Sequence, residues 1–297
     1  MEKIKCAIIG PGNIGMNLLY KIKRSNILEC TLFVGRNKNS KNLIAAKKMG
    51  FNTSSQSVQA LIDNADDYDI AFDATTAESH KTTAAILKKL NKYAIDLTPS
   101  KVGRLCVPCL NWESCLDEKN VNMVTCGGQS MVPIAHALVE ACPKTKYIES
   151  VSTISSKSAG PGTRANIDDY IETTGQALRE FTGVSNTKAM IVLNPADPPI
   201  IMRNTLYAIV EQPNIEKIRQ NVYSMTQLIE KYIPGFRMIV EPTFLKDNII
   251  ATTVCVEGCG DFLPRYAGNL DIITCAAIEM AEHYAGKLLE EQGGCIF

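Results

Sequence analysis

A single cysteine stands between an apolar run and two glycines in the segment MVTCGGQS, residues 123–130. The pattern predicts that Cys126 ends a buried strand and that a helix begins near Gln129. Ligands of open α/β sheets bind at the carboxyl ends of the strands, so this position favours a reactive residue. A nearby helix N-terminus lowers the pKa of a thiol, and the thiolate is the nucleophilic form. Gly127 and Gly128 leave room for a substrate and for the N–H groups that stabilise an oxyanion.

The chain holds 11 cysteines, so the alternative that Cys126 is only a small buried side chain stays open. An odd number of cysteines, many of them within apolar stretches, is unlike a disulfide framework and indicates a reducing compartment. The segment CVPC at 106–109 and the pair Cys255 and Cys259 have no companion ligands nearby in the sequence. We therefore expect no metal site.

A glycine-rich motif, GPGNIG, occupies residues 10–15 between a short apolar run and a segment of helical periodicity. Gly10 permits a tight turn, Gly12 lets the backbone approach a pyrophosphate, and Gly15 allows close packing of helix and strand. Phosphates then bind at the helix N-terminus, whose N–H groups attract anions. The alternative is an ordinary glycine-rich turn. The candidate dinucleotide-binding residues of this loop are Gly10, Pro11, Gly12, Asn13, Ile14 and Gly15.

The choice of dinucleotide depends on the end of the second apolar run, CTLFVG at 30–35. NAD-binding proteins carry an acidic residue near this point, but here the chain continues with Arg36. Arg36 favours the 2′-phosphate of NADP, stacks on an adenine, or is merely solvated. The loop by itself leaves the cofactor open.

Short apolar runs alternate with helical periods in the first half of the chain, which predicts a doubly wound parallel sheet of the Rossmann type. The runs lie at 4–10, 30–35, 68–76, 93–98 and 122–128. Longer alternating strands follow, interrupted by amphipathic helices near 166–182 and 213–231. We expect an α/β protein with a dinucleotide-binding domain over 1–142, completed by a C-terminal helix at 266–292. An α+β domain for substrate binding and dimerisation then covers 143–265.

Composition narrows the class of partner. Lys plus Arg equals Asp plus Glu at 31 each in 297 residues, which gives no reason to expect nucleic acid. The N-terminal apolar run is too short for a signal peptide, and no stretch approaches the length of a membrane span. We expect a cytoplasmic protein that binds neither nucleic acid nor membrane.

Eight segments resemble one family in order along nearly the whole chain. They are GPGNIG, FVGRN, FDATTAESH, DLTPSKVG, MVTCGGQS, SSKSAGPGTRANIDDY, LNPADPPIIMRNT and YAGNLDI. The chain is similar to the CoA-acylating acetaldehyde dehydrogenases that work with a 4-hydroxy-2-oxovalerate aldolase in the meta-cleavage pathways of aromatic hydrocarbon catabolism.

The resemblance implies oxidation of acetaldehyde with NAD, a thioester on Cys126, and coenzyme A as the acyl acceptor. It also implies an aldolase partner, and we expect a homo-oligomer. Further nucleotide contacts are expected from Ser158, Ala159, Gly160, Pro161, Gly162, Thr163, Arg164, Ala165, Asn166 and Asn269. The string SAGPGTR can instead be only a turn and a helix cap.

One residue departs from the family pattern. The family carries MRDT with an aspartate that assists the thiol, whereas this chain carries MRNT with Asn204. An amide does not titrate and cannot act as a base. Either the helix N-terminus and other neighbours generate the thiolate, or the assisting group lies elsewhere, or activity is reduced.

The three histidines are expected to play no catalytic part. His136 should be packed or capped on its helix, His283 should be structural, and His80 should lie at the surface, with the cofactor cleft as the alternative. Two other functions stay open. One is a phosphorylating dehydrogenase resembling the semialdehyde enzymes, and the other is a catalytically weakened nucleotide-binding homologue.

Overall fold

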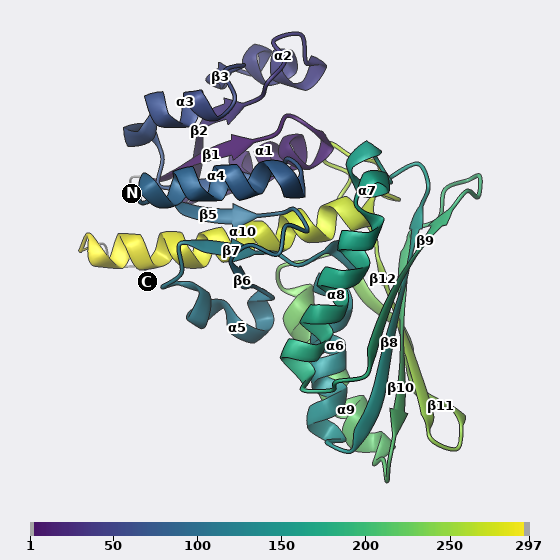
Figure 1. The fold of residues 1–297 in the computed structure, drawn as a ribbon. Helices are drawn as coiled ribbons and strands as arrows, with labels where there is room; N and C mark the ends of the chain where they lie inside the picture. Colours follow the sequence, from purple (N-terminus) through teal and green to yellow (C-terminus); the bar gives the residue numbers. More distant parts are fainter. Residues whose placement is uncertain (1–2, 294–297) are drawn as a thin grey trace. The chain divides into compact units, whose positions relative to one another are not determined.

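The computed structural model describes residues 3–293. The chain forms two compact units (Figure 1). The first comprises the residues up to Met123 together with those from Thr274 onward, and the second comprises Val124–Ile273. Each unit has its own sheet and its own core.

A seven-stranded parallel sheet forms the first unit, in the order β3-β2-β1-β4-β5-β7-β6. Its strands are β1 (Ile4–Ile9), β2 (Leu28–Val34), β3 (Thr53–Ser54), β4 (Ile70–Asp73), β5 (Tyr93–Asp96), β6 (Arg104–Leu105) and β7 (Asn120–Asn122). Every residue of β4 and β5 is buried, as expected for strands covered on both faces. The predicted doubly wound parallel sheet is confirmed.

Helices connect these strands and cover the sheet (Figure 1). They are α1 (Asn13–Arg24), α2 (Lys41–Lys48), α3 (Val58–Asp63), α4 (Ala77–Lys89), α5 (Pro108–Cys115) and the part of α10 (Gly268–Glu291) that follows Ile273. Aromatic stacking holds α10 in this unit. Tyr284 stacks on Tyr93 with ring centroids 3.8 Å apart, and His283 stacks on Trp112 at 4.0 Å.

The second unit is built on a five-stranded sheet in the order β11-β12-β10-β8-β9. Its strands are β8 (Thr145–Ser155), β9 (Thr187–Asn194), β10 (Met202–Val210), β11 (Phe236–Lys246) and β12 (Ile249–Val256). Only β8 and β9 pair in parallel, and the other neighbours are antiparallel. Alternate residues of β10 are buried, so one face of the sheet carries the core.

The helices of this unit are α6 (Cys126–Ala141), α7 (Pro161–Ala165), α8 (Ile167–Thr182) and α9 (Ile215–Glu230). The two predicted amphipathic helices are α8 and α9. The apolar stripe of α9 is buried, whereas α8 buries a face centred on Tyr170, Thr174 and Leu178 and leaves Ile171 exposed. Figure 1 shows α6, α8 and α9 together on one face of the sheet. The α+β architecture of this part of the chain is confirmed.

Helix α6 belongs to the second unit, whereas a division at residue 142 places it in the first. It packs against α8, α9, β8 and β10. Because it is apolar on nearly all sides, it is buried between the other helices and the sheet. Among the helices of the described residues, none has the length and apolar character needed to cross a membrane.

Candidate active site

The glycine loop of the first unit joins β1 to α1. Gly10 has a φ of 101°, and a Cβ atom there would collide with the backbone of Ala74. A Cβ atom on Gly15 would collide with the carbonyl oxygen of Gly10, so this glycine allows the turn and helix to pack closely. Both positions therefore require glycine for the reasons that the motif predicts.

Gly12 differs from these two glycines because space surrounds it. A Cβ atom there would meet no described atom within 4 Å, and the residue is exposed. Gly12 is the N-cap of α1 and offers no side chain to the first N–H groups of that helix. These N–H groups suit a phosphate, so the loop fits a dinucleotide. Arg36 is exposed after β2.

Cys126 is the first residue of α6, and this corrects two expectations. The strand β7 ends at Asn122, and the helix begins at Cys126 instead of near Gln129. The Thr125 side chain explains the early start, because its Oγ1 accepts a hydrogen bond from the N–H of Gly128 at 2.8 Å. The sulfur therefore lies at the helix N-terminus itself.

The two glycines after Cys126 serve close packing. A Cβ atom on Gly127 would collide with the hydroxyl groups of Tyr170 and Ser152, and one on Gly128 would collide with the Val124 side chain. Larger residues would push the start of α6 away from α8 and β8. The glycines thus bring Cys126 next to the polar groups of these two elements.

The electrostatics of Cys126 contradict the expected lowering of its pKa. The residue is partly exposed, but protein atoms crowd the thiol, and this burial raises its pKa to about 11. Tyr170 and the backbone N–H groups of Cys126 and Gly127 lower the pKa by less. Burial outweighs the helix N-terminus, so the expectation of an acidic thiol in this protein was wrong.

Two polar side chains that the sequence did not single out, Tyr170 and Ser152, lie against Gly127 next to this thiol. Tyr170 lies in the first turn of α8, and Ser152 lies on the buried face of β8. Asn204 pairs with Ser152 in the strand register and is fully buried. The Tyr170 hydroxyl, the Ser152 hydroxyl and both polar atoms of Asn204 make no regular hydrogen bond within residues 3–293. No short motif marks Tyr170 or Ser152, so only their spatial position reveals them.

The string SAGPGTR folds back on itself. Arg164 donates from Nε to the carbonyl oxygen of Ala159 at 3.1 Å and from Nη2 to Ser156. Asn166 donates to the carbonyl oxygen of Gly162 at 2.6 Å. These bonds form a compact turn around α7, which ends at the junction with α8. The turn interpretation is therefore compatible with the geometry, and a role in nucleotide binding stays a prediction.

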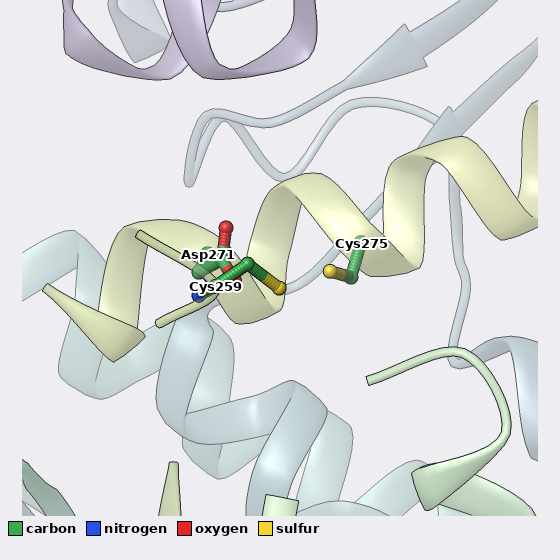
Figure 2. A group of neighbouring side chains, drawn as sticks. All are labelled: Cys259, Asp271 and Cys275. Carbon is green, nitrogen blue, oxygen red and sulfur yellow. Dashed lines mark hydrogen bonds between the residues drawn. The ribbon is translucent and has the colours of Figure 1, made fainter. Parts of the chain in front are cut away.

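The beginning of α10 carries further buried polar residues. Asn269 is 2% exposed, and its Oδ1 has no hydrogen-bond partner in the described part of the chain. Asp271 accepts a hydrogen bond from the backbone N–H of Cys259 at 2.9 Å. Figure 2 shows Cys259 beside Asp271, with Cys275 one turn further along α10. Asp271 is thus a neighbour of Cys259 that the sequence spacing did not reveal, and it anchors the loop before the helix.

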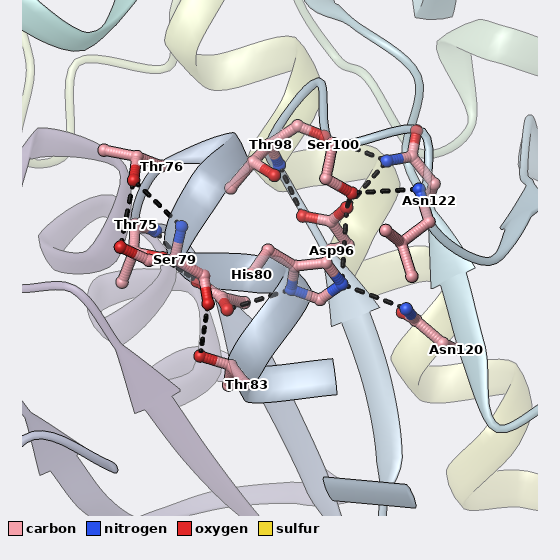
Figure 3. Close-up of polar contacts among 12 residues, drawn as sticks. Thr75, Thr76, Ser79, His80, Thr83, Asp96, Thr98, Ser100, Asn120 and Asn122 are labelled. Atoms are coloured by element: carbon pink, nitrogen blue, oxygen red, sulfur yellow. Dashed lines mark hydrogen bonds and ion pairs between the residues drawn. The ribbon is translucent and has the colours of Figure 1, made fainter. Parts of the chain in front are cut away.

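His80 is fully buried, so the expectation of a surface position was wrong. Its Nδ1 lies 2.9 Å from Asp73 Oδ2, and its Nε2 lies 2.9 Å from Asn120 Nδ2 and 3.5 Å from Asp96 Oδ2. Figure 3 shows His80 on α4 between Asp96, the last residue of β5, and Asn120, the first residue of β7; Asp73 is the last residue of β4. Burial lowers the pKa of His80, but Asp73 and Asp96 outweigh it and raise the pKa. Burial raises the pKa of Asp96 to about 6.

The other two histidines fit the roles that were expected for them. The Nδ1 of His136 lies 2.7 Å from the carbonyl oxygen of Phe181, which ties α6 to α8. His283 stacks on Trp112. Both residues therefore have structural contacts.

Comparisons with known proteins agree on one family. The family model for prokaryotic acetaldehyde dehydrogenase, dimerisation, matches residues 126–264. A Pectobacterium atrosepticum protein named acetaldehyde dehydrogenase is 49% identical over 283 residues, which cover 95% of each chain. One from Geobacillus stearothermophilus is 46% identical over 98% of this chain and 99% of the relative. One from Carboxydothermus hydrogenoformans is 49% identical over 98% of this chain and 96% of the relative.

Proposed function

The chain belongs to the acetaldehyde dehydrogenase family, and from this premise we propose that it oxidises acetaldehyde to acetyl-CoA with NAD through a thioester on Cys126. Membership of this family makes it an oxidoreductase. The observation that carries the proposal is the position of Cys126, a partly exposed thiol at the first residue of α6. A nucleophilic sulfur next to the first N–H groups of a helix is an arrangement that supports covalent catalysis on a carbonyl group, because the N–H groups can stabilise the oxyanion.

In the first step the thiol of Cys126 loses its proton and the sulfur attacks the carbonyl carbon of acetaldehyde. The carbonyl oxygen becomes an oxyanion, and the N–H groups at the start of α6 are placed to stabilise it. Bound NAD⁺ would supply the hydride acceptor for the former aldehyde carbon, and Cys126 would then hold the acyl group as a thioester. The thiol of coenzyme A then attacks the thioester, and the Cys126 sulfur leaves as a thiolate.

The open surroundings of Gly12 and the first N–H groups of α1 support the binding of the NAD pyrophosphate at the glycine loop. Ser158 to Asn166 and Asn269 stay proposed nucleotide contacts on the family resemblance. We propose NAD over NADP, with Arg36 lying over the adenine. The ratio of kcat/KM for the two cofactors tests this preference, and a clear preference for NADP would contradict it.

Purified protein supplied with acetaldehyde, NAD⁺ and coenzyme A, with NADH formation as the readout, tests the whole proposal. Turnover that depends on coenzyme A supports it. Turnover that depends on inorganic phosphate would instead identify a phosphorylating dehydrogenase. Nucleotide binding without turnover would identify a weakened homologue.

The partners form a further part of the proposal. The matched family model describes dimerisation, which supports a homo-oligomer formed through residues 126–264. A 4-hydroxy-2-oxovalerate aldolase partner rests on the resemblance, with the chemical reason that free acetaldehyde is volatile and reacts with amines. A cytoplasmic location rests on the cysteine composition. Size-exclusion chromatography from the native source, with mass spectrometry of co-eluting chains, tests for the aldolase, and elution of the protein alone would contradict a stable complex.

A further inference from the structure

The Cys126 thiol needs a group that stabilises its charged form. Burial raises its pKa to about 11, so the thiolate is scarce at neutral pH. Asn204 cannot accept the proton, because an amide does not titrate. A hydrogen-bond donor that faces the sulfur would favour the thiolate without acting as a base.

Tyr170 is held in place for this task. The side chain is buried, and its hydroxyl occupies the space that a Cβ atom on Gly127, the residue after Cys126, would need. Helix α8 is fixed against the start of α6, because Thr174 Oγ1 lies 2.7 Å from Thr125 Oγ1. Thr174 also donates to the carbonyl oxygen of Tyr170 at 2.7 Å. The phenol ring therefore has a defined position at the N-terminus of α6.

We infer that Tyr170 is a catalytic residue whose phenolic O–H donates a hydrogen bond to the Cys126 thiolate, an inference that rests on the proposed role of Cys126. The S–H bond breaks, the proton passes to bulk solvent, and the sulfur keeps the electron pair. Tyr170 keeps its own proton throughout. Its pKa is raised, mainly by burial, so the phenol is a donor at neutral pH. Hydrogen bonds to a charged acceptor are stronger than neutral ones.

Ser152 is the positioning residue for this phenol. Its hydroxyl faces Tyr170, where donation of its hydrogen to the phenol oxygen lowers the phenol pKa. The side chains of Ser152 and of its strand neighbour Asn204 make no regular hydrogen bond among the described residues. Ser152 then donates to the Tyr170 oxygen, and Tyr170 donates to the sulfur. Hydrogen bonds connected in this way strengthen one another.

A purely structural role explains the ring of Tyr170 but not its hydroxyl. A buried hydroxyl without a regular partner destabilises the fold, and phenylalanine would fill the same space without that effect. The hydroxyl gains its strongest partner when the sulfur becomes charged.

The test compares the alkylation of Cys126 by iodoacetamide in the wild type and in Tyr170→Phe, from about pH 6 to about pH 9, with the Cys126 peptide followed by mass spectrometry. Alkylation follows the thiolate fraction, so Tyr170→Phe should react about 10- to 100-fold more slowly at each pH, with a parallel pH profile. The kcat/KM for acetaldehyde should fall in the same range. Tyr147→Phe is the matched control, because it removes a phenol hydroxyl that is bonded to Glu149 instead. Its alkylation rate should equal that of the wild type.

An unchanged alkylation rate in folded Tyr170→Phe would overturn the inference, even if turnover fell. If Tyr170→Phe does not fold, Ser152→Ala tests the inference instead, because this variant keeps the Tyr170 ring and removes only the Ser152 hydroxyl that orients it. It should slow alkylation by roughly 2- to 5-fold, within the range of one neutral hydrogen bond, and no slowing would overturn the inference. Alkylation requires neither NAD nor coenzyme A. Failure of the proposed function would therefore appear separately, as a wild-type protein without CoA-dependent turnover.

Discussion

Buried polar side chains lie around Cys126 in the second unit and around His80 in the first, and their hydrogen bonding differs. Around His80, the imidazole and the carboxylates of Asp73 and Asp96 all have close polar partners (Figure 3). Around Cys126, the hydroxyl of Tyr170 and both polar atoms of Asn204 make no regular hydrogen bond within the described chain. Both regions lie where a helix follows a strand of the first sheet. Thr98 Oγ1 and Asn120 Oδ1 in the His80 region also make no hydrogen bond within the described chain, but the imidazole and the carboxylates there are paired.

The difference has an energetic meaning. A buried polar group without a partner destabilises a protein by about 1–3 kcal/mol, whereas breaking a paired buried charge costs about 3–5 kcal/mol. The His80 region therefore depends on its polar contacts for stability. In the Cys126 region, the buried polar groups without partners lower the stability of the fold instead. Substitutions in the two regions should consequently differ in their effect on folding and on turnover.

The largest expected effect is on turnover, in Cys126→Ser. This variant should lose all measurable NADH formation with acetaldehyde, NAD⁺ and coenzyme A, because a serine hydroxyl without a base is a poor nucleophile. Its free energy of unfolding should stay within about 1 kcal/mol of the wild type, since the change in volume is small. Nucleotide binding, measured by NADH fluorescence, should persist. A rate near that of the wild type would remove Cys126 from the mechanism.

His80→Leu should have the largest effect on stability. It leaves the carboxylates of Asp73 and Asp96 buried without the imidazole between them, so the free energy of unfolding in urea should fall by about 3–5 kcal/mol. His136→Leu is the control, because His136 is partly exposed and its ion pair with Glu140 is at the surface. The control also loses the hydrogen bond to the carbonyl oxygen of Phe181, so it should lose about 1–2 kcal/mol. Equal losses of unfolding free energy in the two variants would contradict the view that the His80 network contributes more to stability than a surface ion pair.

The pH dependence of stability should change in Asp96→Asn. Burial raises the pKa of Asp96 from 3.8 to about 6, so between these values the folded protein holds a proton that the unfolded chain has lost. The stability from this group is present at low pH and is lost as pH rises from about 4 to about 6. Relative to Asp96→Asn, the wild type should therefore lose up to ~3 kcal/mol across this window in urea unfolding.

His80 acts in the same direction at higher pH. Its pKa is raised, so its contribution is complete below the unfolded value of about 6.5 and is lost as pH rises through the folded value. Asp117→Asn is the control, because the pKa of that exposed carboxylate is lowered by Lys287, which gives the opposite sign. A difference between wild type and Asp96→Asn that does not depend on pH would contradict the assignment.

The smallest expected effect is on the free energy of unfolding of Asn204→Leu. Leucine fills a similar space without unpaired polar atoms, so the free energy of unfolding should stay unchanged or rise by about 1 kcal/mol. Asn122→Leu is the matched control in the other region. Asn122 donates to Asp96 at 2.7 Å and to the carbonyl oxygen of Thr98 at 2.9 Å, so this variant should lose about 1–3 kcal/mol. Losses of the same size at both positions would remove the contrast between the regions.

Several features of the candidate site follow from local pattern. The need for glycine at positions 10 and 15 agrees with the motif, because Gly10 has a φ of 101° and Gly15 packs against the carbonyl oxygen of Gly10, two limits that arise within the loop itself. The start of α6 was misplaced, because the cap is one threonine hydroxyl, Thr125, in a run that otherwise looks like a strand. The position of His80 was wrong because a histidine on a helix shows no sequence sign of the distant carboxylate Asp96 that pairs with it.

The sequence by itself determined the order of strands and helices, the glycine loop and the candidate nucleophile, since periodicity and short motifs depend on neighbours along the chain. The tertiary structure alone decided that the hydroxyls of Tyr170 and Ser152 meet at Gly127, next to Cys126, and that burial raises the pKa of the Cys126 thiol. Tyr170 lies on α8 and Ser152 on β8, and only the packing of these elements against α6 brings them to the sulfur. Burial and electrostatic environment are sums over all nearby atoms, and most of those atoms belong to residues that are distant in the sequence.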